Sequence, residues 1–119
     1  MIYPLEIILP MIPPSANHYV KHTRSGRHYI TAEAKAFREA VVLFSRGQQV
    51  RYPFYAMEIY LNLGPKQKQD LDNCAKVILD SLVLAEIIDS DAKITCLTLH
   101  KKRHKQPSTQ ITIWEGKRP

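Results

Sequence analysis

The chain has 119 residues, of which 45% are hydrophobic and 24% are charged, and its formal net charge is +6. This length suits one compact domain, and this composition excludes an intrinsically disordered chain because it can form a core. The longest apolar runs fall far short of the ~20 residues that a membrane-spanning helix needs, and no secretory signal is visible. We therefore expect a cytoplasmic protein without a membrane partner.

The first half of the chain predicts a strand, a hairpin and a helix. Residues 3–9 are mostly apolar and β-prone, and the prolines that follow them end this strand. Two β-prone segments, 18–22 and 27–30, flank a connection that contains glycine, which favours a hairpin. Thr31 then offers an N-cap for a helix over 32–46, where apolar residues recur at helical spacing.

The second half predicts a strand, a second helix and two further strands. Residues 55–63 alternate between apolar and polar, as a half-buried strand does, and apolar residues at helical spacing follow in 72–85. Two β-prone segments, 94–102 and 109–114, complete the order. Because no repeat or linker divides the chain, we expect one α+β domain over 1–119, with a mixed β-sheet and two main helices.

The charges are distributed unevenly. All five aspartates lie between positions 70 and 91, where Lys76 is the only cation, so the rest of the chain is strongly basic. A basic surface attracts a polyanion such as nucleic acid, and an acidic cluster can hold divalent cations against that polyanion. A helix with a solvated acidic face produces the same cluster, so charge alone leaves both interpretations open.

Asp70 and Asp72 stand where the second helix is expected to begin. If residue 70 is extended and Asp72 is the N-cap, both carboxylates can face one point in front of the helix. Magnesium prefers oxygen ligands, commonly one or two carboxylates with waters and phosphates. Lys76 and Asp80 follow at intervals of four residues, on the same helical face as Asp72. The structural alternatives are a plain N-cap at Asp72 and a surface ion pair at Lys76.

A second acidic pair, Asp89 and Asp91, precedes the strand expected from residue 94. This pair could return to the first pair in space, or it could form only a polar turn. The Asn73 side chain could form a hydrogen bond with a carboxylate that binds metal, or it could only bond to the unpaired backbone groups at the start of the helix. Cys74 and Cys96 lie outside any CxxC spacing, so we expect two buried thiols rather than a disulfide or a zinc site.

These residues form a recognisable motif. The segment Asp70-Leu-Asp-Asn-Cys-Ala-Lys-Val-Ile-Leu-Asp-Ser-Leu, with the later Ile87-Ile-Asp-Ser-Asp, resembles the core motif of the RusA family of Holliday junction resolvases. The segment Leu9-Pro-Met-Ile-Pro-Pro-Ser-Ala-Asn-His-Tyr is similar to the family's proline-rich entry. The resemblance covers nearly the whole chain, and its specific part is Asp-Leu-Asp-Asn-x-x-Lys joined to a late Asp.

The resemblance implies a homodimeric, magnesium-dependent endonuclease that resolves four-way DNA junctions by paired nicks in recombination and repair. It implies that Asp70, Asp72 and Asp91 bind one or two Mg²⁺ ions per subunit, for which Mn²⁺ can substitute, and that Lys76 is the essential basic residue beside them. Asp89 is the alternative third ligand, because Ser90 separates two carboxylates that are usually adjacent in the family. No small-molecule cofactor is implied, and a bacterial or phage origin is expected.

Basic residues in three segments are candidates to contact DNA phosphates. They are Arg24 and Arg27 in the hairpin, Lys66 and Lys68 before the aspartates, and Lys101, Lys102, Arg103 and Lys105 around the last turn. We expect the last group to lie on a hairpin that reaches only phosphates flanking the cut. The alternative functions are a non-catalytic basic DNA-binding module and a metal-dependent nuclease for other branched DNA.

Overall fold

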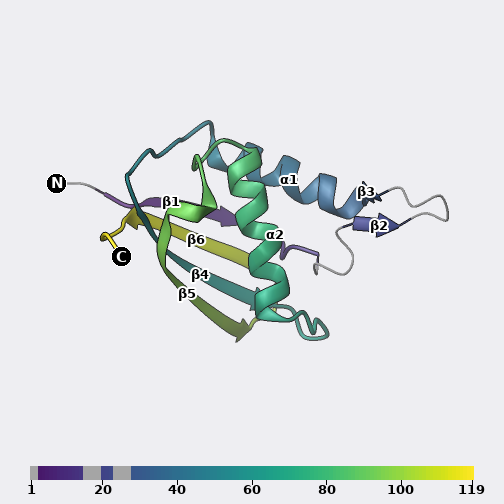
Figure 1. Ribbon diagram of the computed structural model, residues 1–119. Helices are drawn as coiled ribbons and strands as arrows, with labels where there is room; N and C mark the ends of the chain where they lie inside the picture. The colour runs from purple at the N-terminus through teal and green to yellow at the C-terminus, as the bar shows by residue number, and fades with distance from the viewer. Residues whose placement is uncertain (1–2, 15–19, 23–27) are drawn as a thin grey trace.

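The computed structural model describes residues 3–14, 20–22 and 28–119. Its elements are β1 (Leu5–Leu9), β2 (Val20–His22), β3 (His28–Ile30), α1 (Ala32–Ser45), β4 (Tyr55–Leu63), α2 (Leu71–Leu84), the short 3-10 helix η2 (Asp91–Lys93), β5 (Ile94–Arg103) and β6 (Ser108–Glu115) (Figure 1). The predicted α+β class and the two main helices are confirmed. In the described part of the chain, no helix is both long enough and apolar enough to cross a membrane.

The main sheet has four strands in the order β1-β6-β4-β5. Strands β4 and β5 are parallel, whereas β6 is antiparallel to both β1 and β4, so the predicted mixed sheet is confirmed. Strands β2 and β3 form a separate antiparallel pair, as the hairpin prediction requires. Both helices lie on one face of the main sheet, and β5 forms one of its edges (Figure 1).

One hydrophobic core joins the sheet to both helices. Strand β4 buries Tyr55, Met57, Ile59, Leu61 and Leu63, and most of the residues between them are only half-buried. The core cluster combines this strand with residues of β1, α1 and α2, among them Ile7, Phe37, Val41, Val77, Ile78 and Leu82. Each large aliphatic side chain stabilises the fold by about 1.5–3 kcal/mol when it is fully buried, so this packing fixes α2 on the sheet.

The first helix begins and ends where its sequence indicates. Thr31 is the N-cap, and its hydroxyl oxygen accepts a hydrogen bond from the backbone N–H of Ala34 at 3.2 Å. At the other end, Arg46 and Gly47 have positive φ angles of 54° and 74°, which turn the chain out of the helix.

The two cysteines differ in their environment. Cys74 in α2 is buried, as predicted, but Cys96 in β5 is exposed, so its predicted burial is wrong. Cys96 pairs with Ala56 of β4, whose neighbours in β4 point into the core, so both side chains lie on the sheet face opposite the helices. The sequence could not show which face of β5 the helices would cover.

Strands β4 and β5 determine where the acidic segment lies. Because they are parallel, their carboxyl ends lie at the same edge of the sheet. The chain leaves β4 at Leu63 and reaches the start of α2 after a short loop (Figure 1). The first turn of α2 is therefore held near this edge, and Asp70 and Asp72 are held there with it.

Candidate metal and DNA site

Helix α2 begins slightly earlier than the sequence predicts. Its N-cap is Asp70, which has extended backbone angles (φ −83°, ψ 139°) and a side chain that makes no capping hydrogen bond. Asp72 lies in the first helical turn, so its predicted role as N-cap is wrong. The prediction that residue 70 is extended is confirmed, and its carboxylate is not consumed by capping.

Asn73 contacts both of the first two carboxylates. Its side-chain Nδ2 donates to Asp70 Oδ2 at 3.4 Å, and its backbone N–H donates to Asp72 Oδ1 at 3.0 Å. Both aspartates are exposed, and they lie at the helix N-terminus, whose partial positive charge stabilises carboxylates. Of the two roles considered for Asn73, contact with a candidate ligand carboxylate is confirmed.

The charges around the first turn act on Cys74. Burial and the negative charge of Asp70 raise the pKa of this thiol to about 11, while the positive charge of Lys101 opposes the rise. The thiol is therefore protonated at neutral pH. Asp70 and Lys101 therefore both lie close enough to Cys74 to act on its thiol.

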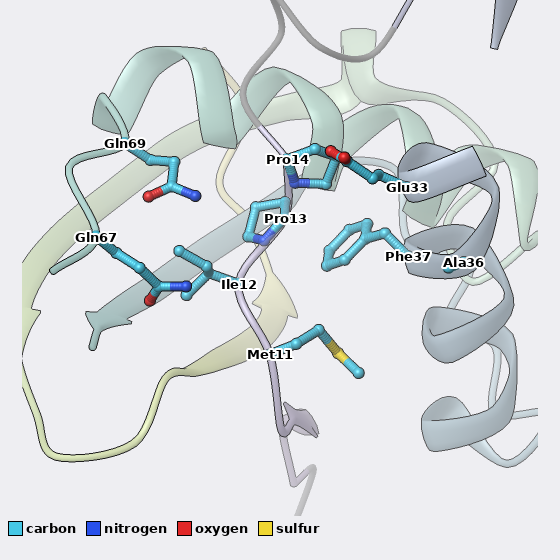
Figure 2. Close-up of a pocket in the computed structure, with 9 residues that line it drawn as sticks. All are labelled: Met11, Ile12, Pro13, Pro14, Glu33, Ala36, Phe37, Gln67 and Gln69. Atoms are coloured by element: carbon cyan, nitrogen blue, oxygen red, sulfur yellow. The ribbon is translucent and has the colours of Figure 1, made fainter. Parts of the chain in front are cut away.

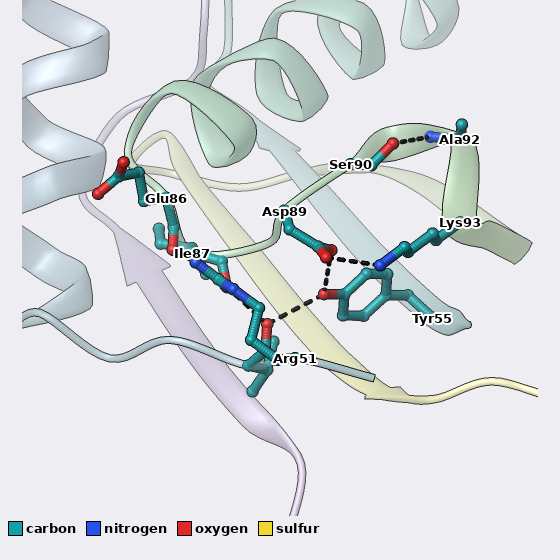
Figure 3. Close-up of polar contacts among 9 residues, drawn as sticks. Arg51, Tyr55, Glu86, Ile87, Asp89, Ser90, Ala92 and Lys93 are labelled. Atoms are coloured by element: carbon teal, nitrogen blue, oxygen red, sulfur yellow. Dashed lines mark hydrogen bonds and ion pairs between the residues drawn. The ribbon is translucent and has the colours of Figure 1, made fainter. Parts of the chain in front are cut away.

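Asp89 has a structural role in this chain. Its Oδ1 accepts a hydrogen bond from the Tyr55 hydroxyl at 2.7 Å, and its Oδ2 forms an ion pair with Lys93 Nζ at 2.5 Å (Figure 3). These two contacts, that of Lys93 first, lower the pKa of the Asp89 carboxyl from 3.8 to about 2. Both oxygens are thus engaged by neighbouring side chains that tie the segment after α2 to the start of β4.

The Asp89→Asn chain is expected to be less stable than the wild type at pH 7, because the charged partner of Lys93 is lost. The folded carboxyl has the lower pKa, so its contribution is present above about pH 4 and is lost as the pH falls towards 2. The difference in urea midpoint should therefore shrink over that interval. Glu39→Gln, at an exposed position of α1, is the control, and equal midpoints of Asp89→Asn and wild type at pH 7 would contradict this role.

Asp91 lies apart from the first acidic pair. It begins η2 and lines a depression of about 360 Å³ together with Asp80, Arg38 and two apolar residues of α2. Asp80 follows Asp70 by ten residues, or about 15 Å along the helix axis. Residues 3–14 and 31–119 contain no group of three or more Asp, Glu, His or Cys side chains placed to hold a metal ion. One chain therefore does not bring Asp91 to Asp70 and Asp72.

Lys76 projects from the second turn of α2 and is exposed. Its spacing permits ion pairs with Asp72 and Asp80, but in the described part of the chain neither pair is formed. The surface-pair alternative for Lys76 is therefore wrong.

The basic residues of β5 divide between the two faces of the sheet. Lys101 and Arg103 are paired in register with Leu61 and Leu63, which are buried against Cys74 of α2. Paired residues share a face, so both cations lie on the face that carries α2. Strand β4 lies between β5 and β6 in the sheet, so these two strands do not form the predicted hairpin. The prediction that Lys101 and Arg103 lie on a remote hairpin is therefore wrong.

Lys102 lies on the opposite face, where its Nζ is 5.0 Å from the centre of the Tyr60 ring. Lys105 is exposed in the turn between β5 and β6. Lys66 and Lys68 are exposed in the loop between β4 and α2. The two hairpin candidates, Arg24 and Arg27, lie outside the described residues.

A cavity of about 270 Å³ adjoins the loop that ends at Asp70 (Figure 2). Met11, Ile12, Pro13 and Pro14 form part of its wall, α1 contributes Glu33, Ala36 and Phe37, and the loop contributes Gln67 and Gln69. The proline-rich segment, the first helix and the loop before the aspartates therefore meet beside the candidate metal site.

Comparison with known proteins identifies the family. The family model for Endodeoxyribonuclease RusA matches residues 10–114, which include every candidate ligand. The crossover junction endodeoxyribonuclease of Enterobacteria phage 82 is 33% identical over 92 residues, 75% of each chain. That of Escherichia coli strain K12 is 31% identical over the same length, and that of E. coli O139:H28 is 32% identical over 114 residues, 92% of this chain and 93% of the relative. The chain therefore belongs to the RusA family of crossover junction endodeoxyribonucleases.

Proposed function

We propose that this chain is a magnesium-dependent endonuclease that resolves four-way DNA junctions by paired, symmetric nicks. The observation that carries the proposal is the pair of exposed carboxylates, Asp70 and Asp72, which both accept hydrogen bonds from Asn73 at the start of α2. They stand in the segment that the family model matches. The relatives are named as crossover junction endodeoxyribonucleases, which supports branched DNA as the substrate.

Asp70 and Asp72 suit a magnesium ion. Magnesium takes oxygen ligands and is commonly held by one or two carboxylates, with waters and substrate phosphates completing its coordination. Two adjacent, exposed carboxylates at a helix N-terminus meet that requirement. An ion held there would activate a water for attack on the scissile phosphate and stabilise the leaving oxygen.

Lys76 would stabilise the negative charge on the scissile phosphate during the reaction. Lys76 lies four residues beyond Asp72, about one helical turn further along α2. A fixed positive charge at that distance favours the transition state, in which negative charge builds on the phosphate oxygens. The expected products are 5′-phosphate and 3′-hydroxyl ends, which a ligase can seal.

Asp91 is our choice for the third carboxylate, because both oxygens of Asp89 are engaged by Tyr55 and Lys93. Asp91 lies beside the later part of α2, away from Asp70. A second copy of the chain can supply the missing carboxylate if Asp91 of one subunit faces Asp70 and Asp72 of the other. A four-way junction also needs two opposed nicks, which a chain with one site can make only as a two-fold dimer.

The chain is therefore expected to sediment as a dimer, both free and on a four-way junction. A monomer under both conditions would contradict the proposed assembly.

A co-expressed mixture of Asp70→Asn and Asp91→Asn chains tests whether the site is shared. If the two carboxylates come from different subunits, the mixed dimer keeps one intact site and nicks one strand of the junction. If they come from one subunit, every site lacks a ligand and the mixture is inactive. Each variant expressed alone is the control and should be inactive in either case.

The function itself is tested with synthetic four-way, three-way and linear duplex DNA, each with magnesium or with a chelator. We expect cleavage of the four-way junction only when magnesium is present. Binding without cleavage would favour a non-catalytic DNA-binding module. Equal cleavage of three-way DNA would favour a nuclease for branched DNA in general.

A further inference from the structure

We propose that Arg103 positions Asp70, by fixing the loop that carries this carboxylate, rather than contacting DNA. The proposal rests on the proposed function for its account of what Asp70 does. It assigns to β5 a part in the geometry of the metal site, through a side chain whose spacing in the sequence predicted only a phosphate contact.

The contacts of Arg103 are with the backbone of the loop. Its Nη1 donates to the carbonyl oxygen of Gly64 at 2.6 Å and to that of Gln67 at 2.7 Å. These carbonyls stand near the beginning and the middle of the segment between β4 and α2. One guanidinium nitrogen thus joins two points of the loop to the carboxyl end of β5.

The loop reinforces this attachment. The Gln67 side-chain oxygen accepts the backbone N–H of Gly64 at 2.8 Å, and the Gln67 N–H donates to the Gly64 carbonyl at 3.2 Å. The backbone N–H of His104 donates to the Leu63 carbonyl at 2.8 Å, which holds the ends of the two strands together. Gly64 and Gln67 therefore form a closed turn, and the carbonyl oxygens of both residues accept hydrogen bonds from Arg103.

This turn lies directly before the candidate ligand. Asp70 follows Gln67 by three residues, a distance that the backbone spans in about 10 Å at most. On its other side, Asp70 is continuous with α2, which Cys74 and its neighbours anchor in the core. The Asp70 side chain makes no capping bond, and it accepts a hydrogen bond from Asn73, which itself belongs to α2. Its position therefore depends on two anchors, the helix and the turn held by Arg103.

The test compares Arg103→Ala and Arg103→Lys with Lys102→Ala. Lys102 is the matched control because it is the adjacent cation in β5 but lies on the face away from α2. Three measurements are made: Mn²⁺ binding by calorimetry without DNA, amide hydrogen exchange of residues 64–70 in metal-free protein, and the magnesium concentration that gives half-maximal cleavage at saturating junction.

We expect Arg103→Ala to bind Mn²⁺ about 10-fold or more weakly, since residues that orient metal ligands typically contribute at this level. Its magnesium requirement should rise by a similar factor, and residues 64–70 should exchange faster. Arg103→Lys keeps a donor and should restore part of the affinity. Lys102→Ala should leave the two DNA-free measurements, Mn²⁺ binding and the exchange of residues 64–70, at the wild-type value.

One result would overturn the proposal. In that case Arg103→Ala keeps the wild-type Mn²⁺ affinity and loop exchange but binds the junction more weakly, with a smaller salt dependence. Arg103 would then be a phosphate contact. Gln67→Ala removes the side-chain bond to Gly64 without changing the charge, and it should also weaken Mn²⁺ binding. If Arg103→Ala does not fold, Gln67→Ala serves as the test of the proposal.

The wild-type chain separates this proposal from the proposed function. If it binds Mn²⁺ but cleaves no junction, the proposed function is refuted and the test of Arg103 by Mn²⁺ binding still stands. If it binds no Mn²⁺, both the proposed function and the role of Arg103 are overturned.

Discussion

The Asp70→Asn chain is expected to bind a four-way junction at least as tightly as the wild type and to cleave it at least about 100-fold more slowly. The substitution keeps the shape of the side chain but removes the negative charge that a metal ion requires. Changes to residues that only orient a ligand cost about 10–100-fold, so loss of a ligand should cost no less. Removing the charge also reduces repulsion between this side chain and DNA phosphates.

Binding of Asp70→Asn is measured by gel shift in a chelator, and its cleavage in a single turnover with magnesium. Asp72→Asn should behave in the same way, because both carboxylates accept hydrogen bonds from Asn73 at the start of α2 and are proposed to bind the same ion. Glu39→Gln, an exposed change on α1, should cleave normally. Cleavage by Asp70→Asn at close to the wild-type rate would remove the basis for a metal site at the start of α2.

The Lys76→Ala chain is expected to lose about 100-fold or more of its cleavage rate at saturating junction. Removal of a single group that stabilises charge in a transition state commonly has an effect of this size. The defect should persist when protein is added in excess, because the lost charge acts on the reaction and not on binding. Single-turnover rates measured over a range of protein concentrations separate the two effects.

Lys102→Ala provides the contrast for Lys76→Ala. Lys102 lies on the face opposite α2, so we expect it to reach only phosphates away from the cut. Its loss should weaken binding and reduce the slope of log affinity against log salt by roughly 0.9. Full recovery of Lys76→Ala activity with excess protein would show that Lys76 serves only to bind DNA.

Patterns of local sequence predicted the elements well. The alternation of β4 and the helical spacing of apolar residues in α2 gave bounds that agree with the structure to within a residue. The start of α2 was misplaced because Asp70 and Asp72 are equally good N-caps. The choice between them depends on the first helical hydrogen bond, from Cys74 N–H to the Asp70 carbonyl at 3.1 Å, which the sequence does not reveal.

Contacts between distant segments could not be predicted in the same way. Tyr55 and Asp89 are 34 residues apart, and Arg103 and Gly64 are 39 residues apart. Both contacts depend on how β4 lies against its neighbours in the sheet, which no local pattern encodes. The division of Lys101 and Lys102 between two faces did have a signal, since successive residues of a strand alternate in direction.

Mapping the nicks on a four-way junction tests the central claim most directly. Each of the four strands is end-labelled in turn, and the junction is incubated with the wild-type chain and magnesium. We predict nicks at symmetric positions on two opposed strands, with 5′-phosphate and 3′-hydroxyl ends that DNA ligase seals into linear duplexes. Nicks on all strands without symmetry, equal cutting of linear duplex, or cleavage that continues in a chelator would contradict the assignment of a magnesium-dependent junction resolvase.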